Sequence, residues 1–279
     1  MIQALLKFEF LQNAFLAGIL IGVIAPLLGV FLVVRRQALI ADALSHITLA
    51  GIAASLLMGK YVTSWQFVNP VYMGMGFSAV GSLFIEQLRK VYKHFEELAI
   101  PITLSGGIGL GVVFISLADG FNSDLFNYLF GSVIAISRSD LLAVTVITII
   151  VLAVVILLYK ELFFLSFDEE HAVVSGIRGK WIHIVFILIV AFVIAVSMQI
   201  VGVLLVSALM TLPVAASIRI AKGFKQTIFL SILIGEASVI GGLILAYYLD
   251  IAPGGTIVLL SAIILVIILI LKRWQQGKS

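Results

Sequence analysis

The chain has 279 residues, of which 62% are hydrophobic and 11% are charged, and its formal net charge is +3. This composition excludes an ordinary soluble domain, in which about 25% of the residues are charged. The small net charge and the lack of long basic runs argue against nucleic-acid binding, and the absence of cysteine excludes disulfides and thiolate metal sites.

Apolar segments of about 20 residues recur along the whole chain, and each could cross the ~30 Å hydrocarbon core of a bilayer as a helix. The first segment is too long for the core of a signal peptide, so we expect it to be a retained helix. The apolar block over residues 182–221 is about twice as long as one span, and we divide it near Ser197–Gln199. The sequence predicts an all-α, polytopic transmembrane helical bundle of about nine spans, at residues 11–34, 38–59, 67–86, 98–117, 140–159, 181–197, 199–218, 227–248 and 254–271.

The basic residues provide a test of this count, because cytoplasmic loops of membrane proteins carry an excess of Lys and Arg. With nine alternating spans, one side of the membrane receives 14 of the 17 basic residues, and the other receives Lys7, Lys60 and Arg138. We therefore expect the N-terminus outside and the C-terminus in the cytoplasm. His183, close to Lys180, is expected at the cytoplasmic interface.

The stretch RRQALIADALSHITLAG (35–51) places Asp42 and His46 one helical turn apart inside the second segment. Residues at i and i+4 face the same way, so the carboxylate and the imidazole can converge on one point. An aspartate at that depth costs about 2.5–3.5 kcal/mol, which calls for a partner, a cavity or a function. Two interpretations remain open. Either Asp42 pairs with Arg36 or His46 and fixes helix packing, or the pair binds a divalent metal such as zinc or manganese.

Two ligands are too few for a closed zinc site, which normally has four. Two copies of the pair across a two-fold axis would supply two carboxylates and two imidazoles. Two-fold dimers are the commonest closed assemblies of soluble proteins, so the metal interpretation includes a homodimer with the ion on its axis.

Two connections are longer than hairpin turns. The outer one, at residues 118–139, is rich in aromatic residues and predicts a short helix at the membrane surface. The inner one, at residues 160–180, predicts a short cytoplasmic helix near 168–176, with an acidic first turn and a terminating glycine. The residues that define this helix are Asp168, Glu169, Glu170, His171 and Gly176.

Glu236 is the remaining acidic residue well inside a predicted span. It either lines the cavity and guides the cation, or hydrogen-bonds a Ser or Thr of a neighbouring helix. The glycines of GGIGLG (106–111) suit close helix packing and lack the spacing of a nucleotide-binding loop. ATP-driven work would therefore need a separate ATPase chain.

Four motifs in order resemble the permease subunits of bacterial ABC transporters that take up zinc and manganese. The motifs are RRQALIADALSHITLAG, YLFGSVIAIS (128–137), VGVLLVSALMTLPVAAS (201–217) and YYLDIAPGGTIVL (247–259). The resemblance covers nearly the whole chain. It implies a single transmembrane permease domain over residues 1–279, in a multi-pass protein of the bacterial plasma membrane.

The resemblance also implies a homodimer bound to two cytoplasmic ATPase subunits and supplied by an extracytoplasmic metal-binding protein. It assigns Asp42 and His46 to the metal site of the translocation path, and the helix near 168–176 to ATPase coupling. Zn²⁺ or Mn²⁺ would be the transported substrate, with no permanently bound cofactor. Ala50 stands where manganese-type sequences more often have proline, which favours zinc.

Two other functional classes remain open. A proton-coupled secondary metal transporter or a channel would use Asp42 and His46 as a proton relay, although no inverted repeat is visible. An intramembrane metalloenzyme would need at least three ligands and a general base on one chain, and no H-E-x-x-H pattern occurs. We expect a permease subunit that is not an enzyme and that moves the ion by alternating access.

Overall fold

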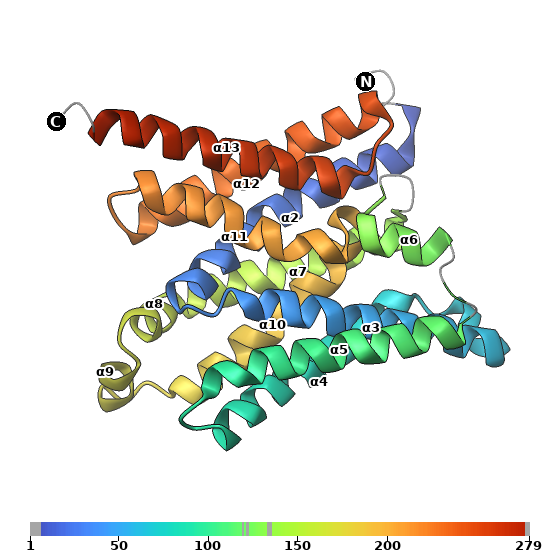
Figure 1. The fold of residues 1–279 in the computed structure, drawn as a ribbon, viewed down its shortest axis with the longest axis horizontal. Helices are drawn as coiled ribbons and strands as arrows, with labels where there is room; N and C mark the ends of the chain where they lie inside the picture. The colour runs from blue at the N-terminus through green and yellow to red at the C-terminus, as the bar shows by residue number, and fades with distance from the viewer. Residues whose placement is uncertain (1–6, 119, 121–122, 133–135, 277–279) are drawn as a thin grey trace.

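The structure is a computed structural model that describes residues 7–118, 120, 123–132 and 136–276. Within these ranges all regular secondary structure is helical. The long helices run roughly along one direction, with α4 and α5 at one edge of the bundle and α12 and α13 at the opposite edge (Figure 1). The prediction of an all-α helical bundle is confirmed.

The long helices of the described residues fall on the nine predicted segments. They are α2 (Glu9–Val34), α3 (Leu39–Tyr61), α4 (Pro70–Val91), α5 (Ala99–Leu117), α7 (Arg138–Leu157), α10 (Gly179–Val201), α11 (Val203–Ile220), α12 (Phe224–Leu249) and α13 (Pro253–Gln276). By length and apolar composition, seven helices of the described chain could cross a membrane, and α4 and α11 are the two long helices outside this group. The number of spans and the orientation of the termini stay predictions.

Five short helices connect the long ones. They are η1 (Thr63–Phe67), η2 (Glu96–Leu98), α6 (Ser123–Phe130), α8 (Tyr159–Phe167) and α9 (Glu169–Val174). Helix α6 lies in the outer connection, where a short helix was expected, whereas residues 133–135 of the neighbouring motif lie outside the described part. Helix α8 was not expected. Neither charged residues nor turn residues in the sequence indicate this helix. Its residues Leu162 and Leu165 are buried, so packing against the bundle accounts for it.

Helices α2, α3 and α10 form the buried centre of the bundle, with 72% of their span residues buried, whereas no more than 33% are buried in α5, α7, α12 and α13. The exposed side chains of the outer helices are largely apolar, as at Val112, Ile149 and Leu259. Apolar surface on this scale is unfavourable in water, so it faces lipid or another subunit.

The long apolar block divides later than predicted. We expected the break near Ser197–Gln199, but α10 continues to Val201 and α11 begins at Val203. Gly202 separates them with a φ of +87°, a conformation that glycine adopts without a Cβ penalty. A Cβ at this position would also collide with the carbonyl oxygen of Leu129 in α6. The break therefore occurs where the chain can turn and admit a neighbouring backbone.

Two further glycines pack at the same break. A Cβ on Gly131 would collide with the carbonyl oxygen of Ile200, and a Cβ on Gly254 would collide with that of Val201. The backbone N–H of Ser132 also donates to the carbonyl oxygen of Gln199, at 2.9 Å. Three of the four sequence motifs thus meet at one place, where their glycines allow backbone to touch backbone.

Replacing Gly202 by Ala should lower the stability of the protein, because the new Cβ disfavours the positive φ and meets Leu129. We expect a loss of at least about 1 kcal/mol, or about 2–4 °C in the thermal midpoint measured in one detergent. Gly106→Ala is the matched control, since a Cβ there has no atom within 4 Å and lies on a regular helix. Equal midpoints for both variants would contradict this account.

Candidate metal site

The start of α3 is fixed by a tight turn that ends α2. The N–H of Arg36 donates to the carbonyl oxygen of Val33 at 3.0 Å, and the N–H of Gln37 donates to that of Leu32 at 2.8 Å. This is the pattern of a Schellman cap, and α3 begins only two residues later, at Leu39. Asp42 therefore lies in the first turn of α3, where the helix dipole favours a carboxylate.

Asp42 and His46 occupy a distinctive stripe on α3. From Ile40 to Ser55 every residue is buried except these two, which are half-exposed. They lie four residues apart, so both half-exposed side chains lie on the same face of the helix. Between Ile40 and Ser55 the helix is thus accessible only where it carries a carboxylate and an imidazole.

One polar neighbour orients the carboxylate. The hydroxyl of Ser207 in α11 donates a hydrogen bond to Oδ1 of Asp42, at 3.3 Å. Among the described residues, Asp42 forms no ion pair with Arg36 or His46, which gives no support to a purely structural pair. Ser207 was missed in the sequence, because one serine in an apolar helix carries no signal of its own.

The two donors of one chain do not complete a metal site. Within the described residues, no group of three or more His, Asp and Glu side chains lies close enough to hold a metal ion. A carboxylate oxygen and an imidazole nitrogen are both ligands for zinc or manganese, so the chemistry fits while the ligand count does not. The missing ligands would have to come from another chain or from the substrate's own water.

Glu236 lies at the contact between α12 and α2, and within the part of the chain that the structure describes it does not join Asp42 and His46 in one metal-binding group. A Cβ on Gly22 would lie 2.8 Å from Oε1 of Glu236, so this glycine makes room for the carboxylate. Among the described residues, buried Oε1 has no hydrogen-bond partner. Neither a cation-guiding role nor a hydrogen bond to Ser or Thr is established for Glu236, and its role in metal transport stays a prediction.

The inner connection folds into α9, at the same end of the bundle as the last turn of α13 (Figure 1). Oδ1 of Asp168 accepts the backbone N–H of His171 at 2.9 Å, and Oδ2 lies 3.2 Å from Nδ1 of the same histidine. Gly176 has a φ of +84° just after the helix, and Ile177 donates back to the carbonyl oxygen of Ala172 at 3.1 Å. The six-residue helix is therefore capped at both ends, and its coupling role stays a prediction.

Comparison with known proteins extends over the whole chain. The model of the ABC 3 transport family matches residues 7–272. The chain is 34% identical over 275 residues to the "Probable metal transport system membrane protein" of Treponema pallidum, covering 99% of this chain and 100% of that protein. It is 33% identical over 266 residues to the "Manganese import system permease protein ScaB" of Streptococcus gordonii, covering 95% and 92%.

The fold is also similar to a solved structure described as "PsaBC from Streptococcus pneumoniae in complex with Fab". The TM-score is 0.86 at 29% sequence identity, and the match covers 100% of this chain and 98% of that chain.

Replacing Ser207 by Ala should weaken metal binding, because the carboxylate of Asp42 loses the hydroxyl that orients it. Loss of such a supporting hydrogen bond typically lowers metal affinity about 10- to 100-fold. Titration of the purified protein with Mn²⁺, read by calorimetry, would measure this. Ser45→Ala is the control, since the Ser45 hydroxyl bonds only the carbonyl of Ala41 in its own helix. An unchanged affinity in Ser207→Ala would remove Ser207 from the site.

Proposed function

The chain belongs to the ABC 3 transport family, and from this premise we propose that it passes a divalent metal ion through a site built from Asp42 and His46. It is a metal ABC transporter permease, a membrane-spanning subunit that is not itself an enzyme, and ATP is hydrolysed by a separate subunit. It is a multi-pass integral protein of the bacterial plasma membrane.

The observation that carries the proposal is the half-exposed stripe on α3. A helix that buries its other residues from Ile40 to Ser55 leaves accessible only a carboxylate and an imidazole one turn apart. Ionisable groups inside a membrane protein are expensive and usually face a partner or a water-filled path. Both side chains are good ligands for a divalent ion, so an ion moving through the bundle would meet its ligands here.

We propose that the complete site lies between two copies of this chain. One copy supplies one carboxylate and one imidazole, and a two-fold axis beside the stripe would double this set to four donors. The partial exposure of Asp42 and His46 in a single chain supports this arrangement, since a second subunit could cover them. The homodimer, the two ATPase subunits and the extracytoplasmic metal-binding protein belong to this proposal.

Among the possible ions we propose Mn²⁺, with Zn²⁺ as the competitor. A relative that covers nearly the whole chain carries manganese import in its name, and carboxylate oxygens suit manganese. The sequence favoured zinc because of Ala50, but Ala50 is buried, and its Cα lies 3.8 Å from where a Cβ of Gly111 would be. The residue type at position 50 therefore adjusts the packing of α3 on α5 and touches the ion only indirectly.

Transport would follow from movement of α9. ATP binding in the partner subunits would shift this short helix, and α8 would pass the motion to the bundle, exposing the ion site to each side in turn. Residues 168–176 are therefore the proposed coupling segment. The whole chain is proposed to form a single permease domain. The site must bind the ion only moderately, since an ion held too tightly would not leave.

Removal of either ligand should abolish uptake. In cells that depend on this transporter, Asp42→Asn and His46→Gln should each lower ⁵⁴Mn accumulation about tenfold or more, because each variant changes two of the four proposed donors at once in a dimer. Ser45→Ala is the control, because Ser45 lies in the same helix and its hydroxyl bonds the carbonyl of Ala41. Uptake that survives both ligand variants at normal membrane levels would refute the site, and preferential uptake of Zn²⁺ by the wild type would refute the choice of ion.

The capped end of α9 offers a test of coupling. Gly176→Ala places a Cβ at a positive φ, which disfavours the cap by about 1 kcal/mol and should weaken ATPase association about fivefold. Gly120→Ala is the matched control, since Gly120 also has a positive φ of +83° and open space, but lies in the connection after α5. Co-purification of the ATPase subunit measures the effect. Equal loss in both variants would mean that α9 has no special part in coupling.

A further inference from the structure

A cavity of about 800 Å³ opens at the end of the bundle where α2 and α4 finish and α10 begins. Six Lys and Arg side chains line it. They are Arg35, Arg36, Arg89, Lys90, Lys93 and Lys180. The helix ends that line the cavity lie at the same end of the bundle as α9 and the last turn of α13 (Figure 1). Asp42 and His46, proposed to hold the metal ion, are not among its lining residues.

Positive charge in this cavity exceeds negative charge. The carboxylates that line it are Glu86 and Glu96. Glu96 accepts from Arg89 at 2.9 Å, and Glu86 lies 3.1 Å from Nε2 of His183. In the described part of the chain, Arg36, Lys93 and Lys180 form no ion pair. The cavity therefore concentrates cations whose charge its own carboxylates do not balance.

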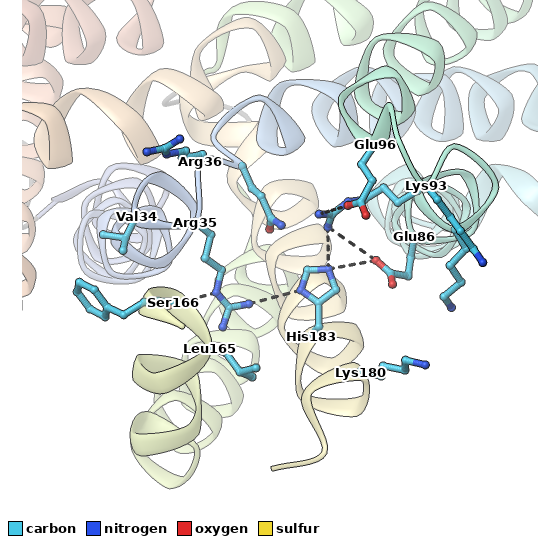
Figure 2. A pocket seen from close by; sticks show the side chains of 14 residues that line it. Val34, Arg35, Arg36, Glu86, Lys93, Glu96, Leu165, Ser166, Lys180 and His183 are labelled. Carbon is cyan, nitrogen blue, oxygen red and sulfur yellow. Dashed lines mark hydrogen bonds and ion pairs between the residues drawn. The ribbon is translucent and has the colours of Figure 1, made fainter. Parts of the chain in front are cut away.

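His183 holds the wall of the cavity in a fixed arrangement. Figure 2 shows its ring between the side chains of Arg35 and Glu86. Nε2 lies 3.1 Å from Oε2 of Glu86 and 3.3 Å from Nη1 of Arg89, and Nδ1 lies 3.4 Å from Nη1 of Arg35. In the tautomer whose Nε2–H donates to Glu86, Nδ1 has a lone pair that can accept from Arg35. Arg35 also donates to the hydroxyl of Ser166 at 3.1 Å and to the carbonyl oxygen of Leu162 at 3.3 Å. These contacts hold the guanidinium of Arg35 in place at the wall of the cavity.

Arg36 occupies a backbone conformation that glycine would adopt more easily. Its φ is +59°, at the left-handed position of the cap that ends α2. A residue with a Cβ costs about 1 kcal/mol more than glycine there. A strained position that carries a cation on the wall of a basic cavity indicates a use for that cation.

The position of the cavity relative to the membrane favours a lipid headgroup over a soluble anion as its ligand. The basic residues of the cavity lie at the ends of α2, α4 and α10, of which α2 and α10 are long and apolar enough to cross a membrane, so the cavity is expected at the level of the phospholipid headgroups. Phe167 lines the cavity with 62% of its surface exposed, and Trp181, next to Lys180, is 67% exposed. Exposed aromatic side chains beside Lys and Arg are typical of the membrane–water interface. Helix α4 also exposes apolar side chains, such as Val80, Leu83 and Phe84, which give it an outer surface for acyl chains.

We propose that this cavity binds a phosphate-bearing anion, and that its ligand is the headgroup of an anionic phospholipid. The headgroup phosphate would lie in this cavity, near the lysines Lys93 and Lys180 of its wall, with the acyl chains along the outer face of α4. Such a lipid would brace the ends of α2, α4, α8 and α10 against one another, directly beside the proposed coupling helix. The site is independent of the metal pair and of the proposed transport function.

The test uses the transporter purified with its ATPase subunit in neutral detergent and titrated with dioctanoyl phosphatidylglycerol or phosphatidylcholine. Native mass spectrometry counts the lipids bound. We expect saturable binding of phosphatidylglycerol and much weaker binding of phosphatidylcholine. In the Lys93→Gln/Lys180→Gln double variant the affinity for phosphatidylglycerol should fall about 30-fold. The control is Lys272→Gln/Arg273→Gln, which removes the same charge from α13 at the same end of the bundle and should bind as the wild type does.

In a second experiment, inorganic phosphate is added to the lipid-bound transporter, and chloride at equal ionic strength is the comparison. Displacement of the lipid by phosphate alone would support the phosphate site and assign it to a soluble ligand. Equal binding of both lipids, or an equal loss in both double variants, would overturn the proposal. So would a loss of the ATPase subunit in Lys93→Gln/Lys180→Gln with unchanged lipid binding, because the cavity would then be a protein-docking surface. Asp42→Asn should keep the lipid, which separates this test from that of metal transport.

Discussion

Direct contact between the backbones of α2 and α11 is the constraint from which the arrangement of the metal pair follows. A Cβ on Gly29 of α2 would collide with the carbonyl oxygen of Met210 in α11, so only glycine permits this approach. Met210 lies three residues beyond Ser207, slightly less than one helical turn, and Ser207 donates to Asp42. The close packing of α11 on α2 therefore sets how near the hydroxyl comes to the carboxylate of α3, which itself starts from the cap of α2. A larger residue at position 29 would displace the partner that orients Asp42.

The same physical device appears where α10 passes into α11. Gly131, Gly202 and Gly254 each admit a carbonyl oxygen or a backbone segment that a Cβ would exclude. Three motifs that are far apart in the sequence meet there, so they act together as a packing joint at the end of the bundle opposite α9. This joint determines where α11 begins, and α11 carries Ser207 towards the metal pair. The packing of these motifs thus affects the position of Ser207 and, through it, the proposed ion site.

Hydropathy predicted where the long helices lie, because lipid-facing segments must be apolar and must satisfy their own backbone hydrogen bonds. It did not place the break at Gly202, since Ser197, Met198 and Gln199 are as compatible with a helix end as with a helix interior. The candidate ligands Asp42 and His46 could be found in the sequence because they interrupt an apolar run at helical spacing. Ser207 could not, because its meaning depends on a contact between residues 165 positions apart. His183 was expected only to mark the interface, and its contacts with Arg35 and Glu86 depend equally on the fold.

Basic residues carry two kinds of information in this chain. In the sequence their distribution reports which loops face the cytoplasm, and any basic residue at the correct side would serve that purpose. The structure adds that six of them converge on one cavity, where His183 fixes Arg35 and where Arg36 accepts an unfavourable backbone conformation. The orientation of the protein in the membrane requires neither that these basic residues line one cavity nor that Arg36 adopts a strained backbone conformation. The convergent cations therefore need a second explanation, and a bound anion at the headgroup level gives one that also stabilises the helix ends beside α9.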